Sequence, residues 1–126
     1  MNKTTTHVFV LEDDLNYLQL LQISLEKHSG IYRFTMDHRP TLEDAIEVLR
    51  RENRFDIVLT DLGLPDSDGL ETLQRIQEAA PKLPVIVLSG YDDPELEMHA
   101  IHYGAQDYLV KGEVEKNILV RSINYA

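Results

Sequence analysis

Reactive side chains stand at the ends of the apolar runs in this sequence. Asp61 follows the run at 57–60, and a carboxylate at such a place can act as a nucleophile or bind a metal ion. Three other apolar runs end in further reactive residues: Glu12, Asp13 and Asp14 together, then Ser89, and finally Lys111. Four of the five strand-like segments therefore end in groups that could do chemistry.

Brought together, these groups favour one kind of chemistry. Several carboxylates within a few ångströms repel one another unless a cation lies among them. Mg²⁺ is preferred over Ca²⁺ because the protein supplies few oxygen ligands, and coordination positions remain for water and a phosphoryl oxygen. The Ser89 hydroxyl and the Lys111 ammonium could then donate to that phosphoryl group. In this hypothesis Asp61 attacks phosphorus and becomes an acyl phosphate.

Short apolar runs alternate with longer amphipathic stretches along the whole chain. We predict strands at 7–11, 32–36, 55–60, 85–88 and 107–110. The runs at 55–60 and 85–88 are continuously apolar, which is typical of strands covered on both faces. The run at 32–36 alternates and is predicted to lie at an edge of the sheet.

Helices are predicted between these strands, from apolar residues spaced three or four apart. The repeats are Leu15, Leu18, Leu21 and Leu25; Leu42, Ala45, Ile46 and Leu49; and Leu70, Leu73, Ile76 and Ala80. Asp14, Thr41 and Asp93 are predicted N-caps, and Pro94 suits the first position of a fourth helix. A fifth helix is expected from about Glu113 to the end of the chain.

Five strands alternating with five helices imply an α/β fold with a parallel sheet, right-handed crossovers and helices on both faces. In such sheets a ligand site lies beyond the carboxyl ends of the strands, where the strand order reverses. If the first and third strands are neighbours there, Asp13 and Asp61 meet although 48 residues separate them (61 − 13). The predicted site is an acidic cluster joined by Ser89 and Lys111.

Length and composition limit the functions that the chain can have. At 126 residues it has the size of one domain, so residues 1–126 are expected to form a single unit. No apolar stretch approaches the roughly 20 residues that span a bilayer, and residues 1–6 lack an apolar signal-peptide core. Cys is absent, and a cytoplasmic location is predicted. The net charge of −10 opposes direct binding to nucleic acids or anionic membranes.

With these residues in place, the sequence resembles the receiver domain of two-component response regulators, the CheY-like family. The likeness covers essentially the whole chain and rests on five features in order. They are the acidic group in VFVLEDD, the run IVLTDLGLPDSDG around Asp61, the hydroxyl in VIVLSG, and the aromatic residue and lysine in DYLVK. No single motif is decisive, but five features at family-like spacing make the resemblance specific.

The resemblance implies a fold and a reaction. The fold is a doubly wound, flavodoxin-like (βα)5 arrangement whose five-stranded parallel sheet has the order 2-1-3-4-5. Asp61 is implied to accept a phosphoryl group from a histidine kinase or phosphotransfer protein. Lys111 is implied to pair with this group, and Ser89 to sense it.

A Mg²⁺ site is implied as well. In the family's pattern Asp13 and Asp61 would ligate the ion directly, and Glu12 would act mostly through water. The backbone carbonyl of Gly63 would complete the protein's share of the ligands.

The resemblance further implies a switch. Tyr108 matches an aromatic residue that turns inward when the hydroxyl, here on Ser89, moves toward the phosphate. That motion would alter the face made by the helix from Pro94, the strand at 107–110 and the final helix, which is the family's usual partner surface. The implied partners are an output domain or downstream protein, or a second copy of the chain. The chain is accordingly expected to be a signalling domain and not an enzyme, one that assists its own phosphorylation and dephosphorylation, at the N-terminal part of a longer protein.

The sequence departs from the family pattern after the active-site lysine. Receivers commonly have Pro there, whereas Gly112 follows Lys111, which favours a looser loop into the last helix.

Three alternatives remain open at this point. The D-S-D-G sequence at 66–69 resembles a motif of haloacid-dehalogenase-type phosphatases, although here it follows Pro65 and not a strand near the start of the chain. A flavin-binding flavodoxin-like domain would share the fold, but the acidic residues at 12–14 would repel its phosphate. A receiver-like docking module that is never phosphorylated would have the same sequence features.

Overall fold

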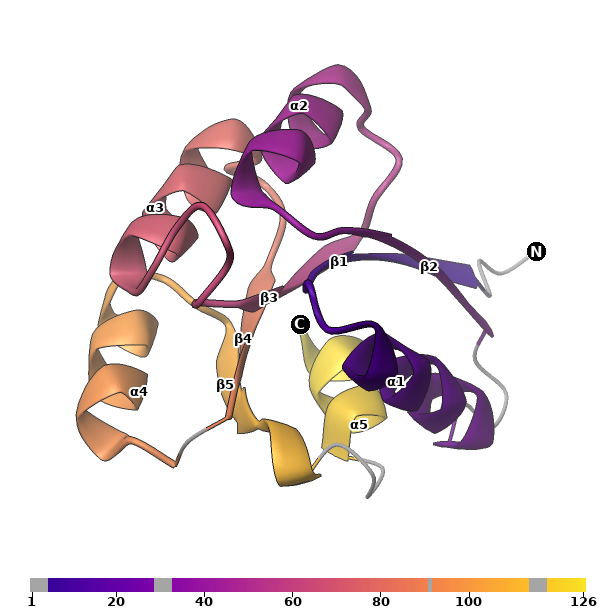
Figure 1. Cartoon of the computed structure of the whole chain (residues 1–126). Helices are drawn as coiled ribbons and strands as arrows, with labels where there is room; N and C mark the ends of the chain where they lie inside the picture. The colour runs from indigo at the N-terminus through magenta and orange to yellow at the C-terminus, as the bar shows by residue number, and fades with distance from the viewer. Residues whose placement is uncertain (1–4, 29–32, 91, 114–117) are drawn as a thin grey trace.

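The computed structural model describes residues 5–28, 33–90, 92–113 and 118–126 of the chain. Strands and helices alternate through these residues (Figure 1). The strands are β1 (Thr5–Leu11), β2 (Arg33–Arg39), β3 (Ile57–Asp61), β4 (Val85–Ser89) and β5 (Asp107–Val110). The helices are α1 (Leu15–His28), α2 (Leu42–Arg51), α3 (Leu70–Ala79), α4 (Pro94–His102) and α5 (Ile118–Tyr125), with a 3-10 turn, η1, at Lys111–Glu113.

The strands form one parallel sheet in the order β2-β1-β3-β4-β5. This order confirms the predicted (βα)5 fold. The first connection leads from β1 to one neighbour, β2, and the next passes back to β3 on the other side of β1, so the strand order reverses there. The carboxyl ends of β1 and β3 consequently lie side by side, with Leu11 paired to Thr60.

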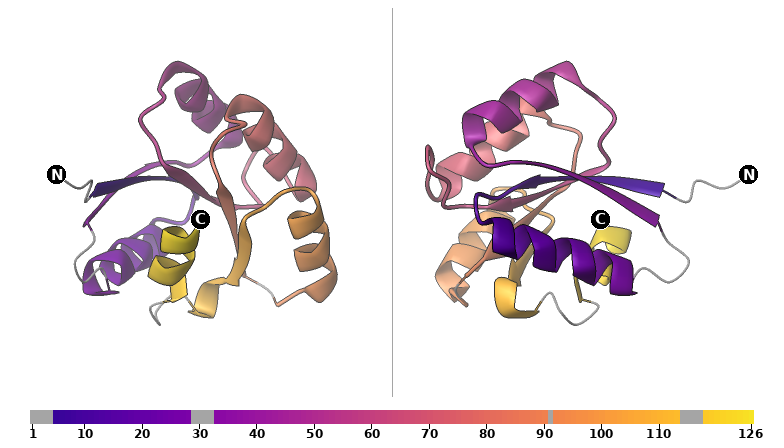
Figure 2. Two further views of the ribbon diagram at one scale, coloured as in Figure 1. Left: turned by 180° about the vertical axis from the view of Figure 1, so that it is seen from behind. Right: turned by 45° about the vertical axis from the view of Figure 1, so that its right-hand side comes forward.

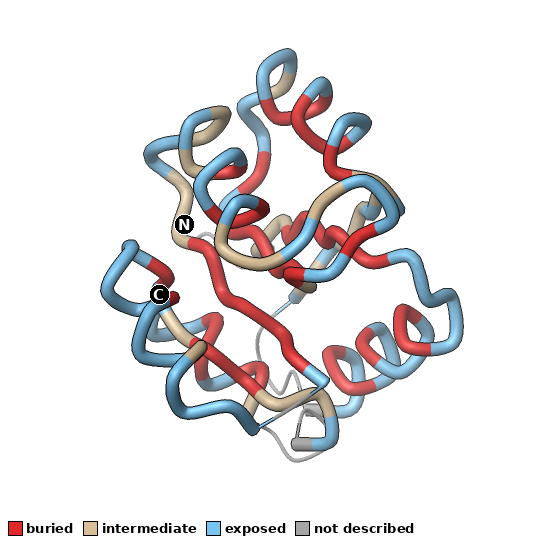
Figure 3. Tube along the Cα trace, turned by 60° about the vertical axis from the view of Figure 1, so that its left-hand side comes forward, coloured by how far each residue is buried: buried red, intermediate tan, exposed pale blue. Residues whose placement is uncertain are grey.

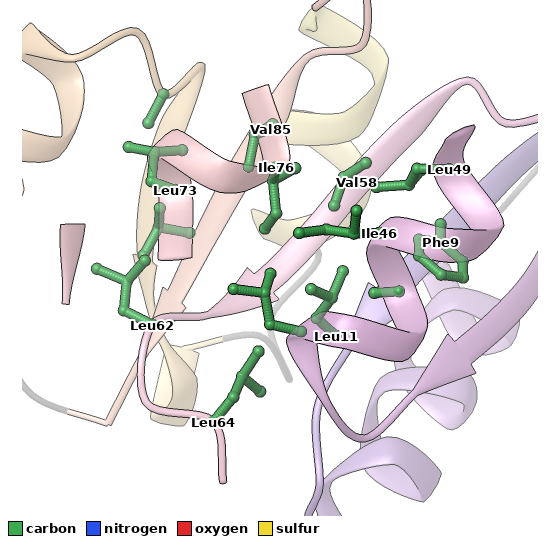
Figure 4. Close-up of a cluster of buried hydrophobic side chains, with 14 of the residues drawn as sticks. Phe9, Leu11, Ile46, Leu49, Val58, Leu62, Leu64, Leu73, Ile76 and Val85 are labelled. Atoms are coloured by element: carbon green, nitrogen blue, oxygen red, sulfur yellow. The ribbon is translucent and has the colours of Figure 1, made fainter. Parts of the chain in front are cut away.

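Helices cover both faces of the sheet, with α2 and α3 on one side and α1 and α5 on the other (Figure 2, right). Each face has its own hydrophobic core. The larger core packs against α2, α3 and α4, and ten of its side chains are labelled in Figure 4: Phe9, Leu11, Ile46, Leu49, Val58, Leu62, Leu64, Leu73, Ile76 and Val85. The second core joins the opposite face to α1 and α5 through Leu18, Leu21, Leu119, Val120 and Ile123, among others.

Burial follows the predicted pattern in the sheet. The residues at 57–60 in β3 and 85–89 in β4 are all buried, whereas residues of β2 are exposed or only partly buried, as expected of an edge strand (Figure 3). Helices show buried and exposed residues in turn, because one face of each packs on the sheet. In the described ranges, no helix is long and apolar enough to cross a membrane.

Three predicted helix caps are confirmed. The Asp14 carboxylate accepts hydrogen bonds from the backbone N–H groups of Asn16 (2.9 Å) and Tyr17 (3.3 Å), at the start of α1. Thr41 and Asp93 likewise accept from the third residue after them, at the starts of α2 and α4. Each such cap contributes about 1 kcal/mol by pairing N–H groups that the first helical turn leaves without a partner.

The sequence prediction was wrong in several local details. The second strand was predicted at 32–36, but β2 continues to Arg39 because it pairs with β1 along its whole length; Tyr32 lies outside the described residues. Phe55 belongs to the core but precedes β3. Leu15 is 68% exposed, since the buried face of α1 begins at Tyr17. The described part of the last helix begins at Ile118, and residues 114–117 lie outside the description.

Candidate functional site

The site lies where β1, β3, β4 and β5 end. Glu12 directly follows β1, Asp61 and Ser89 are the last residues of β3 and β4, and Lys111 directly follows β5. Parallel pairing aligns these ends: Asp61 is paired with Leu88, and Ser89 with Val110. The sheet thus brings four chemically reactive residues to one edge from four separate parts of the sequence.

Lys111 connects two of the acidic residues. Its ammonium Nζ donates to Glu12 Oε1 and to Asp61 Oδ2, each at 2.8 Å. The lysine lies 99 residues from Glu12 and 50 from Asp61 along the chain. The Lys111 ammonium therefore lies between the two carboxylates, a contact that the sequence did not predict.

The two partners of the Glu12–Lys111 pair are buried to different extents. Glu12 is 1% exposed, and its burial raises the pKa of the carboxyl; the hydrogen bond and positive charge of Lys111 offset only part of that rise. The Lys111 side chain is 20% exposed. Burial works to lower the pKa of its ammonium, but hydrogen bonds to Asp61 and Glu12 outweigh this, so the pKa lies above its usual value. The lysine stays charged at neutral pH.

Both oxygens of the Asp61 carboxylate accept hydrogen bonds. Oδ2 accepts from Lys111, and Oδ1 accepts from the backbone N–H of Gly63 at 2.9 Å. The side chain is nevertheless 21% exposed, so a reactant can reach it from solvent. Asp61 is a fixed carboxylate at an open edge, which suits a nucleophile more than a purely structural ion pair.

The remaining predicted site residues lie in different environments. Ser89 is 7% exposed at the end of β4, beside the end of β3. Tyr108 is 6% exposed and belongs to the larger core. Asp13 is exposed in the loop between β1 and α1. A β-carbon placed on Gly63 would lie 3.9 Å from Asp61 Oδ1, so this backbone runs close to the carboxylate.

Tyr17, which adjoins the site from α1, was not predicted from the sequence. Lys111 Nζ lies over its ring, 4.4 Å from the ring centroid. Burial raises the pKa of the Tyr17 hydroxyl above its usual value, and the charges of Glu12 and Asp61 raise it further, so the phenol is neutral. Local sequence gives only a weak signal here, because an aromatic residue on an apolar helix face normally indicates core packing.

The donors at this edge are oxygen atoms, the type of ligand that Mg²⁺ prefers. Among the described residues there is no group of three or more His, Cys, Asp or Glu side chains close enough to hold a metal together. Mg²⁺ does not need such a group, since it is commonly bound through one or two carboxylates and keeps several waters. Asp61 and the neighbouring acidic loop can supply carboxylates, and the backbone at Gly63 passes beside Asp61.

The alternative nucleophile, Asp66, has a structural role instead. Its two carboxylate oxygens accept hydrogen bonds from the backbone N–H groups of Leu42 (2.8 Å) and Glu43 (2.9 Å), at the start of α2. It therefore ties the loop after β3 to the helix that precedes β3. In this structure Asp66 anchors a loop, and none of its contacts among the described residues involves Asp61 or Lys111.

Comparison with known sequences gives a consistent result. A family model described as the response regulator receiver domain matches residues 8–124. Two-component response regulator ARR10 of Arabidopsis thaliana is 36% identical over 105 residues, which make up 82% of this chain and 18% of that protein. Transcriptional regulatory protein ZraR of Escherichia coli K12 is 31% identical over 111 residues, 88% of this chain and 24% of that protein. The chain thus spans about a fifth of the length of these relatives.

Solved structures agree with the sequence comparison. The BeF3-activated N-terminal receiver domain of Klebsiella pneumoniae RstA aligns with a TM-score of 0.80 and 25% identity, over 95% of this chain and 97% of that one. A response regulator receiver domain protein from Clostridium thermocellum also has a TM-score of 0.80 and 25% identity, over 95% and 92% of the two chains. With the fold and the family model in agreement, the chain belongs to the response regulator receiver domain family, whose members are signalling domains.

Proposed function

We propose that this chain accepts a phosphoryl group on Asp61 from a histidine kinase or phosphotransfer protein and thereby switches its partner surface. The observation that carries the proposal is the pair of 2.8 Å contacts by which Lys111 bridges Glu12 and Asp61 at the open edge of the sheet. A lysine in that place is ready to neutralise negative charge that arrives on Asp61. Neither the motif at 66–69 nor a flavin site has a comparable observation in its favour.

The transfer follows from the chemistry of the side chains. A carboxylate oxygen of Asp61 forms a bond to phosphorus while the bond from phosphorus to the donor's leaving group breaks, which leaves an acyl phosphate. Lys111 then moves its hydrogen bond from the free carboxylate to a phosphoryl oxygen, and Ser89 donates its hydroxyl to another. Asp13, Asp61 and the Gly63 carbonyl would hold Mg²⁺, with Glu12 acting mostly through water, and the ion would supply positive charge against the phosphoryl oxygens.

The same residues would assist loss of the phosphoryl group. Water attacks the acyl phosphate, and the positive charge that stabilised formation of the bond also stabilises its hydrolysis. The domain in this sense catalyses only reactions of its own aspartate.

The paired strands β4 and β5 lie between Asp61 and helix α4, and this arrangement supports the switch. Ser89 in β4 is paired with Val110 in β5, and Tyr108 lies two residues earlier in the same strand. The neighbouring helix α4 carries three large exposed apolar side chains, on Met98, Ile101 and on Tyr103 at its C-cap. We propose that α4, β5 and α5 form the partner surface for an output domain, a downstream protein or a second copy of the chain. Phosphorylation shifts an existing equilibrium between two arrangements of this surface.

The same proposal covers the longer protein, its cellular location and the partners of this domain. We infer that residues 1–126 are the receiver domain of a longer signalling protein, because the relatives are several times longer than the matched region. The proposal places this domain in the N-terminal part of that protein and in the cytoplasm. The formal charge of −10 supports protein partners, and it disfavours direct contact of this domain with nucleic acid or membrane.

Phosphoramidate, a small phosphoryl donor, provides the test. The wild-type chain should gain one phosphoryl group with Mg²⁺ and lose this ability with EDTA. Asp61→Asn should accept none, whereas Asp66→Asn should still accept one. The opposite assignment, with transfer lost in Asp66→Asn and kept in Asp61→Asn, would contradict the proposal. Absence of transfer to the wild type would support a docking module.

A further inference from the structure

We propose that Tyr17 is a positioning residue for phosphoryl transfer, because the face of its ring holds the ammonium of Lys111 in place between Glu12 and Asp61. This inference rests on the proposed function, in which Lys111 is the partner of the phosphoryl group. It assigns a role to a residue that lies in α1, outside the strand ends that make up the rest of the site.

The ammonium is enclosed on three sides. Two are the carboxylates of Glu12 and Asp61, each 2.8 Å from Nζ, and the third is the Tyr17 ring, whose centroid is 4.4 Å away. That distance is well inside the roughly 6 Å at which a cation over an aromatic face is attracted to it. Tyr17 is 7% exposed, so the ring also keeps water from this side of the lysine. The attraction is strongest in such a desolvated setting.

The acidic loop itself sets the position of the ring. The Asp14 carboxylate accepts from the backbone N–H of Tyr17, and Glu12 Oε2 accepts from the backbone N–H of Asp14 at 3.2 Å. The Glu12 side chain is therefore linked through Asp14 to the backbone that presents the ring. Two of the three groups that surround Nζ, the Glu12 carboxylate and the Tyr17 ring, are thus connected by hydrogen bonds.

The role belongs to the ring and not to the hydroxyl. The buried Tyr17 hydroxyl has no hydrogen-bond partner within the described part of the chain. A phenylalanine ring would offer Lys111 the same aromatic face without burying an unpaired polar atom. A leucine would keep an apolar side chain in the core of α1 but would leave the ammonium free to turn toward water. Tyr17→Phe is thus the matched control for Tyr17→Leu.

The first measurement detects the contact directly. In a carbon–proton NMR spectrum of the lysine side chains, with Lys111 assigned by its loss in Lys111→Arg, the Cε protons of Lys111 should be shifted upfield by the ring. The shift should persist in Tyr17→Phe and disappear in Tyr17→Leu. An unshifted Lys111 signal in the wild type would overturn the inference.

The second measurement tests the consequence for phosphoryl transfer. With phosphoramidate and Mg²⁺, Tyr17→Phe should react at the wild-type rate, and Tyr17→Leu should react about fivefold to tenfold more slowly, as expected when a partly desolvated cation–aromatic contact is removed. Thermal unfolding of each variant establishes that it is folded. A wild-type rate in Tyr17→Leu, or an equal loss in Tyr17→Phe, would overturn the inference alone. A wild type that accepts no phosphoryl group would overturn the proposed function as well.

Discussion

Glu12 is the most buried ionisable group of the site, and its ion pair with Lys111 offsets part of the free-energy cost of burying the carboxylate. At 1% exposure the carboxylate has lost nearly all contact with water, and its strongest remaining partner is the ammonium 2.8 Å away. A buried charge whose partner is removed is costly, typically by several kcal/mol, unless the group changes its protonation state. The pair is therefore expected to contribute to stability as well as to the proposed chemistry.

Replacing Lys111 should change how the free energy of unfolding depends on pH. We expect Lys111→Met to lower the free energy of unfolding by about 2 kcal/mol at pH 7.5, because Glu12 is left charged and unpaired. Without Lys111 the pKa of Glu12, already raised by burial, rises further. The folded state then binds a proton more tightly than the unfolded state, so stability falls as pH rises from the unfolded pKa through the folded pKa. Urea unfolding at several pH values measures this.

The matched control is Lys82→Met, which replaces an exposed lysine. Its unfolding free energy should follow that of the wild type at every pH. The account of Glu12 would be contradicted if Lys111→Met lost no more stability at pH 7.5 than at pH 4.5.

At the scale of elements, the loop after β3 is held by its neighbours. Asp66 joins the loop to the start of α2, and the Thr72 hydroxyl in α3 donates to the backbone carbonyl of Leu62 at 2.9 Å. These contacts fix the backbone that follows Asp61, including Gly63. Precise placement of the phosphoacceptor thus depends on hydrogen bonds outside the site itself.

Asp66→Asn should weaken this connection. Burial works to raise the pKa of Asp66, but the backbone hydrogen bonds from Leu42 and Glu43 lower it more, so the pKa lies below its usual value. The stabilisation is therefore present above the unfolded pKa of about 4 and is lost as pH falls through the folded pKa. We expect Asp66→Asn to be less stable than the wild type by about 1 kcal/mol at pH 7, because the neutral amide keeps one acceptor oxygen where the carboxylate uses two.

Unfolding curves of both proteins between pH 7 and pH 2 test this expectation. The difference between them should shrink toward zero at the acid end. Asp92→Asn, at an exposed position just before the Asp93 cap, serves as the control for removal of one charge. A difference that is independent of pH would mean that the Asp66 charge does not stabilise the start of α2.

At the scale of the whole molecule, the sequence predicted the layout of the site better than its contacts. Strand ends could be predicted because apolar runs mark buried parallel strands, and all their carboxyl ends meet at one edge. The Lys111–Glu12 contact joins residues 99 positions apart, so no local pattern contains it. Tyr17 was missed and Leu15 was misplaced for one reason: leucine spacing alone does not give the rotation of a helix against its sheet.

The proposed partner surface, made by α4, β5 and α5, is a property of the whole molecule. If α4 takes part in association of two copies after activation, Ile101→Glu should abolish a dimer that beryllofluoride induces in the wild type, because burying an unpaired carboxylate is costly. Leu20→Glu is the matched control, since Leu20 in α1 is 43% exposed and Ile101 is 45% exposed. Sedimentation velocity with and without beryllofluoride measures both. A dimer that survives Ile101→Glu but not Leu20→Glu would place the interface on α1.

The central claim, that Asp61 carries the phosphoryl group, is tested most directly by locating the modified residue. After phosphorylation with Mg²⁺, borohydride reduction converts an aspartyl phosphate to homoserine, which peptide mass spectrometry can assign to one position. The account predicts homoserine at position 61 alone, and none when Mg²⁺ is removed beforehand. Homoserine at position 13 or 66, with Asp61 unchanged, would contradict it.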